Sequence, residues 1–299
     1  MSGRGHARIL DGKAIAAQIH AETSRELETL TVARGSVPEV RVVLCGNDPA
    51  SAVYARRILK TAERVGSRGE LIELGADSTT ESVRDTLRVL NDDPRVAGVI
   101  LQLPLPRGLD ARHIIEALDP LKDLDGIHPQ NAGLIARGED GFAPSCAEAA
   151  LQILRRSQIP IAGRPTVVIG RSNVVGKPAQ LLLIGQDATV TVCHRQTRDL
   201  VARVRAAEIV IVAAGVPALI SGDAIMPGAV VIDCGINVDA GGDVRGDVDF
   251  DSVVPVAGAI TPVPGGVGPV TNAVLLNHLA RAARAQLATV LPVAAMENA

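Results

Sequence analysis

Short apolar runs alternate along the chain with longer segments whose apolar positions recur at helical spacing. The short runs are rich in Val and Ile and lack a polar residue at every second position, which is typical of strands buried on both faces. The predicted strands are Val40–Cys45, Gly98–Leu103, Pro165–Ile169, Thr189–Cys193, Ile209–Ala213 and Ala229–Cys234. The predicted helices are Gly12–Leu30, Ala50–Val65, Thr80–Asp92, Ala111–Ala117, Ala147–Arg156, Pro178–Gly185 and Thr271–Leu287. This alternation predicts an α/β protein with parallel sheets.

The alternating pattern occurs twice along the 299 residues of the chain. A domain usually contains about 100–200 residues, so this length predicts two domains. We place the boundary close to the helix predicted at 147–156, and we expect the last helix to return to the first domain. The predicted domains are therefore residues 1–146 together with 271–299, and residues 147–270.

The charge and the aromatic content argue against nucleic-acid binding. The net charge is −3, whereas a nucleic-acid site requires a concentrated positive field. The only aromatic residues are Tyr54, Phe142 and Phe250, which are too few for a platform on which bases could stack. We therefore expect no nucleic-acid partner.

The cysteines and the beginning of the chain indicate a reducing compartment. None of the cysteines belongs to a CxxC pair, so the sequence predicts no metal site and no redox motif. No apolar run approaches the roughly 20 residues of a membrane span, and the first residues lack the apolar stretch of a signal peptide. We expect a soluble, cytoplasmic protein without a membrane partner.

A glycine-rich turn follows one of the predicted strands and precedes a predicted helix. Its sequence is Gly170-Arg-Ser-Asn-Val-Val-Gly176-Lys-Pro178. Free backbone N–H groups and the helix dipole at such a turn favour a phosphate, and glycines allow the backbone to approach it closely. The spacing differs from GxGxxG because Ser172 stands near the place of a second glycine. An ordinary strand-to-helix turn is the alternative interpretation.

The next predicted strand ends where a dinucleotide-binding protein contacts the adenosine ribose. This end carries His194 and Arg195 instead of an acidic residue, and basic groups suit the 2′-phosphate of NADP. NADP is therefore favoured over NAD, although Arg195 and Arg198 could merely solvate a loop. Two further strand ends supply glycines. The residues predicted to bind the cofactor are Gly170, Arg171, Ser172, Val175, Gly176, Pro178, His194, Arg195, Thr197, Gly215, Gly235 and Ile236.

Three segments of the first half could contribute to a second ligand site. Tyr54, the only tyrosine, lies in a predicted helix, where it could stack a flat ligand or simply belong to the core. Gln102 interrupts an apolar run, and a buried amide there must find partners. Asp125 lies in Lys-Asp-Leu-Asp-Gly, where a role in the turn and a role in binding both fit.

These segments together resemble the bifunctional methylenetetrahydrofolate dehydrogenase/methenyltetrahydrofolate cyclohydrolase family, the FolD-type enzymes. The resemblance covers Ile9 to Leu279 and depends on DPAS-x-x-Y, QLPLP, KD-x-DG, GRS-x-x-VG-x-P, GDVDF and TPVPGGVGP. It implies an N-terminal α/β domain and a Rossmann-like NADP-binding domain with a cleft between them. It also implies a homodimer that pairs through the second domain.

The resemblance further implies the chemistry and the substrate-binding residues. Hydride would leave 5,10-methylenetetrahydrofolate for the nicotinamide, and water would then open the methenyl product to 10-formyltetrahydrofolate. Tyr54, Gln102 and Asp125 would be the catalytic residues, with Asp125 as the carboxylate that binds the pterin. The implied substrate-binding residues are Tyr54, Gln102, Leu103, Pro104, Asp125, Pro264, Gly265 and Gly266.

One position departs from the family pattern in a way that bears on activity. The family has a lysine four residues after the tyrosine, where this chain has Ile58. Lys60 lies roughly 200° around the helix from that position, and Arg57 stays protonated and cannot act as a base. Because the family lysine is linked chiefly to the cyclohydrolase step, we predict that this activity is impaired or absent. The dehydrogenase step needs mainly the alignment of two ligands and can survive.

Other departures keep alternative functions open. Ser145-Cys146-Ala147 replaces the family's Cys-Thr-Pro, and Asn277-His278 also differs from the usual pattern. The main hypothesis is an NADP-dependent methylenetetrahydrofolate dehydrogenase with little or no cyclohydrolase activity. The alternatives are a fully bifunctional enzyme, a paralogue repurposed for another substrate, and a non-catalytic binding protein or dimerisation partner.

Overall fold

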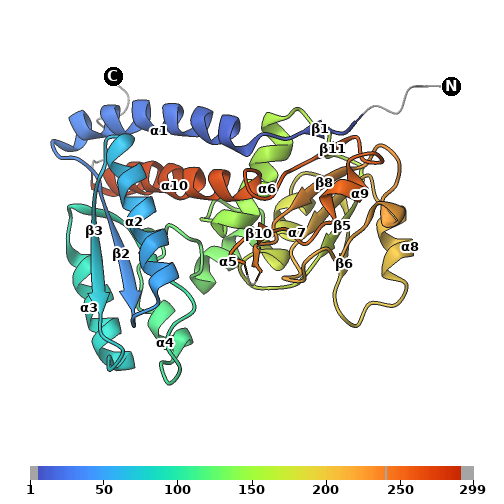
Figure 1. Ribbon diagram of the computed structural model, residues 1–299. Helices are drawn as coiled ribbons and strands as arrows, with labels where there is room; N and C mark the ends of the chain where they lie inside the picture. The colour runs from blue at the N-terminus through green and yellow to red at the C-terminus, as the bar shows by residue number, and fades with distance from the viewer. Residues whose placement is uncertain (1–5, 240, 291–299) are drawn as a thin grey trace. The chain divides into compact units, whose positions relative to one another are not determined.

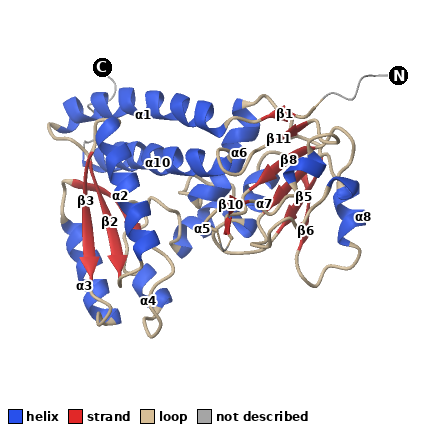
Figure 2. Ribbon diagram, in the orientation of Figure 1, coloured by secondary structure: helices blue, strands red, loops and turns tan. Residues whose placement is uncertain are grey.

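The computed structural model describes residues 6–239 and 241–290 and divides them into two compact units. Unit 1 contains residues 6–17, 135–139, 143–239 and 241–272; unit 2 contains residues 18–134, 140–142 and 273–290. Each unit has its own parallel sheet (Figures 1 and 2). The predicted two-domain α/β class is therefore confirmed. Residues 1–5, 240 and 291–299, which fall in the predicted domains, lie outside the described residues.

The sheet of unit 1 has the topology of a dinucleotide-binding fold. Its strand order is β1-β11-β8-β7-β5-β6, and all these pairs are parallel. Because β5 lies between β6 and β7, the strand order reverses at β5, and ligands bind at the carboxyl ends beside such a reversal. The strands are β1 (Arg8–Ile9), β5 (Pro165–Ile169), β6 (Thr189–Cys193), β7 (Ile209–Val212), β8 (Val230–Asp233) and β11 (Ala259–Ile260).

Short helices and a small hairpin complete unit 1. The hairpin joins β9 (Asn237–Val238) and β10 (Val244–Arg245), which pair antiparallel after the end of β8. The helices are α6 (Ser145–Arg156), α7 (Gly176–Ile184), α8 (Leu200–Arg205) and α9 (Phe250–Val253), with a 3-10 turn at Gly222–Ala224.

Unit 2 contains a three-stranded parallel sheet in the order β3-β2-β4. The strands are β2 (Glu39–Cys45), β3 (Arg68–Leu74) and β4 (Val96–Leu101). One core cluster joins apolar residues of β2 and β4 to α2 and α10, and a second cluster packs α3 against the same strands. The helices are α1 (Gly12–Arg34), α2 (Pro49–Arg64), α3 (Thr80–Asp92), α4 (Ala111–Ile115), α5 (Pro129–Ala136) and α10 (Val267–Val290), of which α1 and α10 begin in unit 1.

All the predicted strands and helices are present, with ends that differ by a few residues. The predicted strand Gly98–Leu103 was wrong at its end, because β4 stops at Leu101 and the chain then turns. Strand β3 was missed because charged residues interrupt its apolar positions, as expected for a half-exposed strand at a sheet edge. Helices α5, α8 and α9 were missed because they are too short to show a helical period.

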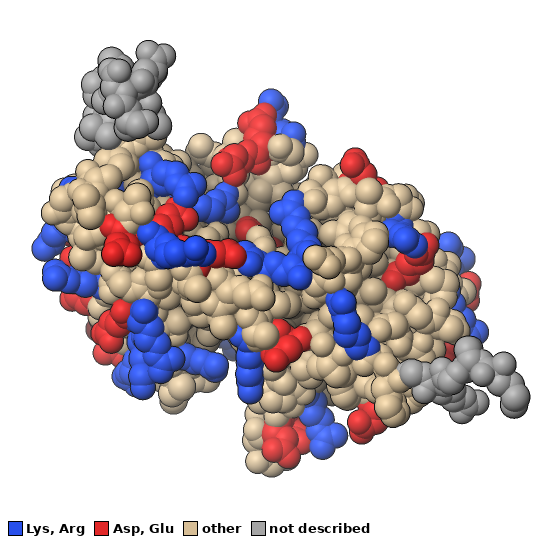
Figure 3. Space-filling view, turned by 90° about the horizontal axis from the view of Figure 1, so that it is seen from above, with Lys and Arg blue, Asp and Glu red and all other residues tan. Residues whose placement is uncertain are grey.

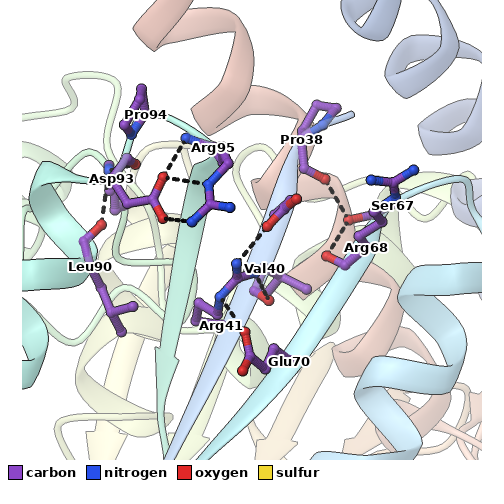
Figure 4. A network of polar contacts seen from close by, with 12 residues as sticks. Pro38, Val40, Arg41, Ser67, Arg68, Glu70, Leu90, Asp93, Pro94 and Arg95 are labelled. Carbon is purple, nitrogen blue, oxygen red and sulfur yellow. Dashed lines mark hydrogen bonds and ion pairs between the residues drawn. The ribbon is translucent and has the colours of Figure 1, made fainter. Parts of the chain in front are cut away.

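A network of polar contacts lies at the amino ends of the unit 2 strands (Figure 4). The buried Arg41 of β2 contacts Glu39 and, across the sheet, Glu70 of β3. Beside it, hydrogen bonds from Arg95 lower the pKa of Asp93 to about 2. This network joins the strands at the edge opposite to the carboxyl ends, so its role is structural.

Basic and acidic side chains are interspersed over the face shown in Figure 3, without a continuous stripe of one sign.

Among the described residues, no helix combines the length and apolar character that crossing a membrane requires.

Lys122 is predicted to stabilise unit 2, and replacing it by methionine tests this role. The side chain is buried, and its Nζ donates to the carbonyl oxygens of Leu90, Asn91 and Asp93 at 3.0, 2.6 and 2.9 Å. Lys122→Met removes these three hydrogen bonds, which we expect to lower the free energy of unfolding by about 2–4 kcal/mol in urea titrations. Lys60→Met, at an exposed position, is the control and should change it by less than about 0.5 kcal/mol. Equal effects of the two variants would contradict a structural role of Lys122.

Candidate functional site

The glycine-rich turn after β5 has the geometry of a phosphate-binding turn. Gly170 has φ +116°, and a Cβ there would lie 2.1 Å from the carbonyl oxygen of Ala213. A Cβ at Gly176 would lie 2.1 Å from the carbonyl oxygen of Gly170. The turn therefore closes on itself only because both residues are glycines. Gly176 begins α7, whose dipole favours an anion at this point.

Side chains of the same turn hold it in shape. Ser172 Oγ accepts a hydrogen bond from the Val175 N–H at 3.1 Å, which explains why serine fits near the second glycine of the common pattern. Lys177 Nζ donates to Asn173 Oδ1 at 2.8 Å. Arg171 and Ser172 are exposed, whereas Pro178 is buried in the first turn of α7.

The loop after β6 is a tight turn that presents Arg195 to solvent. The His194 N–H donates to Thr197 Oγ1 at 2.8 Å, and the Thr197 N–H donates to the His194 carbonyl at 2.7 Å. The Gln196 N–H donates to His194 Nδ1 at 3.2 Å. Thr197 and the His194 ring therefore shape the loop, while Arg195 is the exposed basic group at the predicted ribose position.

Two buried carboxylates organise the ends of β7 and β8, and both were missed from the sequence. Asp247 accepts hydrogen bonds from the backbone at Gly215, and Asp233 accepts one from the backbone at Gly235. Burial raises the pKa of Asp233 to about 6. The only indication in the sequence was the presence of aspartates in two otherwise mainly apolar or glycine-containing segments, VVIDCGIN and GDVDF.

Helix α2 places Tyr54 and Ile58 on one face in unit 2. Asp48 caps the helix by accepting from the Ser51 N–H at 2.8 Å, and Pro49 occupies its first turn. Tyr54 is half-buried at the border of the core, whereas Ile58, one turn later, is 0% exposed within it. The position of the family lysine is thus filled by an apolar side chain that belongs to the core.

The ends of the unit 2 strands bring Gln102 and Asp125 toward one edge. Gln102 follows β4 directly, and its N–H donates to the Val43 carbonyl at 2.9 Å. The segment before Asp125 runs parallel to β4 through a bridge between Val99 and Asp123. In this register Asp125 falls beside the end of β4, on the same edge of the sheet as Gln102. Leu103 and Pro104, which come next, are exposed.

The two aspartates of the Lys-Asp-Leu-Asp-Gly segment differ in role. Asp123 is buried, and one of its carboxylate oxygens accepts from the His128 N–H at 2.8 Å and from Asn131 Nδ2 at 2.9 Å. Desolvation raises the pKa of Asp123. Asp125 is half-buried, so it is the carboxylate of this bend that can face a ligand.

His278, at a position where the family pattern is not followed, is a buried residue of α10. Its Nδ1 lies 2.8 Å from the Leu124 carbonyl oxygen, which can only accept, so Nδ1 carries the proton. The ring of Phe142 lies 5.2 Å from the His278 ring, and the Arg281 guanidinium lies 5.1 Å from the same Phe142 ring. His278 therefore fixes the backbone of Leu124, the residue directly before Asp125.

The glycine loop before α10 is part of unit 1. Gly265 has φ +111°, and a Cβ at Gly266 would lie 2.6 Å from the Pro262 carbonyl oxygen. Gly12 packs against the same loop so closely that a Cβ there would lie 1.7 Å from the Gly266 carbonyl oxygen. Pro264 is exposed at the tip of this loop.

A doubly wound parallel sheet with a phosphate-binding turn, together with a second α/β unit, defines a two-domain dinucleotide-binding protein of the dehydrogenase class. Comparison with protein families specifies it further. Residues 10–125 match the tetrahydrofolate dehydrogenase/cyclohydrolase catalytic domain, and residues 144–287 match the NAD(P)-binding domain of the same family. The chain belongs to the tetrahydrofolate dehydrogenase/cyclohydrolase family of enzymes.

Individual relatives are similar over nearly their whole length. The bifunctional protein FolD of Roseiflexus sp. (strain RS-1) is 47% identical over 95% of this chain and 98% of its own. The crystal structure of the bifunctional FolD enzyme of Campylobacter jejuni is similar with a TM-score of 0.91 and 37% identity, over 94% of this chain and 99% of that one. The FolD enzyme of Trypanosoma brucei, solved with an NADP cofactor and an inhibitor, is similar with a TM-score of 0.88 and 37% identity, again over 94% and 99%.

Proposed function

We propose that this protein oxidises 5,10-methylenetetrahydrofolate to 5,10-methenyltetrahydrofolate with NADP as the hydride acceptor. The observation that carries this proposal is the intact cradle at Gly170 and Gly176, in a chain that matches both domains of the family. A Cβ at either glycine would clash with neighbouring backbone and force the turn open, so the residues present fit a bound dinucleotide. The cofactor supplies the chemistry of hydride transfer, and the protein supplies alignment of the two ligands.

The folate is expected to bind residues of unit 2. Tyr54 can stack the flat part of the ligand, and Asp125 can accept hydrogen bonds from the pterin ring. Gln102 can orient the reacting part of the substrate through its amide. No proton transfer is needed for the hydride step itself, so this step does not require an ionisable side chain at position 58.

We propose that the cyclohydrolase activity is impaired or absent. Ring opening of the methenyl cation requires a water molecule to be deprotonated, and general acid–base assistance is worth about 10²–10⁴-fold. The apolar Ile58 cannot accept or donate a proton, and it is buried in the core cluster. The fully bifunctional alternative requires another group to perform this proton transfer.

The proposed function is tested by following NADP reduction in the presence of 5,10-methylenetetrahydrofolate. We expect reduction with NADP to be more efficient than with NAD, because Arg195 is an exposed cation at the predicted ribose position. Arg195→Ser should lower the ratio of kcat/KM for NADP over NAD by about 10–100-fold. Arg198→Ser, which removes an exposed arginine from the same loop, is the matched control and should leave the ratio unchanged.

Each outcome of this test has a defined meaning. A wild-type protein that reduces neither cofactor would overturn the proposed activity and favour a repurposed paralogue or a binding protein. Equal effects of the two arginine substitutions would instead reject Arg195 as the determinant and favour simple solvation of the loop.

We further propose that the protein is a cytoplasmic homodimer. The observation that supports pairing through unit 1 is the position of β6 at the end of its sheet order, with Thr189 and Thr191 exposed. An edge strand has unpaired backbone groups, which a second copy could engage.

A further inference from the structure

Asp247 is a buried carboxylate on which backbone and side-chain donors converge. Its side chain is 0% exposed. Asp247 Oδ2 accepts from the N–H groups of Ala214 and Gly215 at 2.6 and 2.8 Å. Asp247 Oδ1 accepts from the Val216 N–H at 3.0 Å and from Asn237 Nδ2 at 2.8 Å. Each carboxylate oxygen therefore accepts two hydrogen bonds, and the donors that stabilise the negative charge come from two separate segments.

Gly235, two residues before Asn237, is built around the same carboxylate. A Cβ at Gly235 would lie 2.4 Å from Asp247 Cγ, so this position accepts no side chain while Asp247 is in place. The backbone of Asp247 is in turn held by Asp233, whose Oδ1 accepts from the N–H groups of Gly235 and Asp247 at 2.8 and 3.0 Å. Asp233 Oδ2 accepts from the Val248 N–H at 2.9 Å. Asp233 thus positions Asp247, and Asp247 positions the segments 214–216 and 235–237.

The place of these segments in the sheet indicates which half of the cofactor they border. The phosphate-binding turn follows β5, and the adenosine ribose belongs at the end of β6. Strands β7 and β8 lie on the opposite side of β5, and the segments 214–216 and 235–237 follow their carboxyl ends. A dinucleotide whose phosphates lie at the turn after β5 and whose adenosine ribose lies at the end of β6 would extend its nicotinamide half over these two segments.

We propose that Asp247 is a positioning residue for the nicotinamide half of the cofactor. It is buried beneath the segments that border this half and acts through their backbone, without contacting the ring itself. Hydride transfer depends on a narrow range of donor–acceptor geometry, so a shift of these segments affects both cofactor affinity and turnover. This inference rests on the proposed function, because it assumes that a nicotinamide cofactor binds unit 1.

The test compares Asp247→Asn with the wild-type protein, using one ligand with and one without the nicotinamide. Asparagine keeps the shape, but its NH₂ group must face two N–H donors that now have no acceptor. We expect NADP to bind about tenfold more weakly and kcat for hydride transfer to fall by about 10–100-fold. Binding of 2′-phospho-ADP-ribose, which is NADP without its nicotinamide, should stay unchanged. If NAD proves to be the better cofactor, NAD and ADP-ribose replace this pair.

Asp249→Asn is the matched control in the same tract. Asp249 is half-buried and its side chain does not cap the helix that follows, so the same loss of charge should alter neither ligand's affinity. Asn237→Ala is a second variant, which removes one of the donors to Asp247 and leaves its charge in place. It should also weaken NADP binding, by a smaller factor than Asp247→Asn does.

The outcomes separate this inference from the proposed function. A wild-type protein that binds neither NADP nor NAD would overturn the proposed function, and this inference with it. Normal NADP binding and normal turnover in Asp247→Asn would overturn the positioning role alone, as would equal losses for NADP and 2′-phospho-ADP-ribose. If Asp247→Asn does not fold, Asn237→Ala decides, and unchanged NADP affinity in that variant would reject the role.

Discussion

Replacing Ile58 by lysine is expected to raise the rate of methenyltetrahydrofolate hydrolysis by about 10²–10⁴-fold, the usual contribution of a positioned acid–base group. The side chain at position 58 lies one helical turn after Tyr54 on the same face of α2, so a lysine there can extend along that face toward the phenol. Since Ile58 is fully buried, the amine will be partly desolvated. Desolvation lowers the pKa of a lysine and favours the neutral form that can accept a proton.

The measurement follows loss of methenyltetrahydrofolate above its spontaneous hydrolysis, in parallel with NADP reduction. The wild-type protein should reduce NADP and show little hydrolysis, whereas Ile58→Lys should show both. Ile58→Met is the matched control, because its unbranched side chain has a similar volume without an ionisable group. It should leave hydrolysis at the wild-type level.

Two results would contradict this expectation. Rapid hydrolysis by the wild-type protein would mean that another group performs the proton transfer, and the bifunctional alternative would hold. Unchanged hydrolysis in Ile58→Lys, with intact NADP reduction and a normal unfolding transition, would mean that position 58 alone does not account for the missing activity.

Replacing Gly176 by alanine is expected to weaken NADP binding by about 100-fold or more. The added Cβ would lie 2.1 Å from the Gly170 carbonyl oxygen, so the turn must open and the N–H groups at the start of α7 must move. Backbone strain and lost hydrogen bonds to phosphate together amount to about 3 kcal/mol, which corresponds to about 100-fold in affinity. Calorimetric titration with NADP measures this change directly.

Gly185→Ala at the other end of α7 is the control for this substitution. Its Cβ would lie 3.5 Å from the nearest backbone oxygen, that of Leu182, which is ordinary van der Waals contact. We therefore expect Gly185→Ala to bind NADP as the wild-type protein does. Equal affinities of the Gly176→Ala variant and the wild-type protein would show that the dinucleotide does not use this turn.

Strands β5, β7 and β8 of unit 1 could be predicted well because their sequences are almost continuously apolar. β5 and β6 were predicted with correct ends. In contrast, β3 carries three charged residues, Arg68, Glu70 and Glu73, and lies at a sheet edge, so its pairing with β2 depends on contacts made by a distant segment. The β9 and β10 hairpin is too short to leave a periodic pattern.

For the candidate site, the features that local sequence could predict differ more clearly from those that depend on tertiary contacts. Local sequence was sufficient where one segment contains the whole chemical feature, as in the turn from Gly170 to Gly176 and in the presence of Ile58 four residues after Tyr54. Local sequence could not distinguish Asp123 from Asp125, because their different burial depends on Asn131 and on the bridge to Val99.

The sequence by itself determined the α/β class, the family resemblance, the phosphate-binding turn and the absence of a lysine at position 58. The turn and the residue at position 58 each depend on one short segment, whereas the class and the resemblance depend on patterns and motifs distributed along the chain. Only the tertiary structure decided that Ile58 belongs to the core, and that Asp247 is shared by the separate segments 214–216 and 235–237. Such roles depend on which donors surround a buried group, and those donors come from segments that are brought together only when the chain folds.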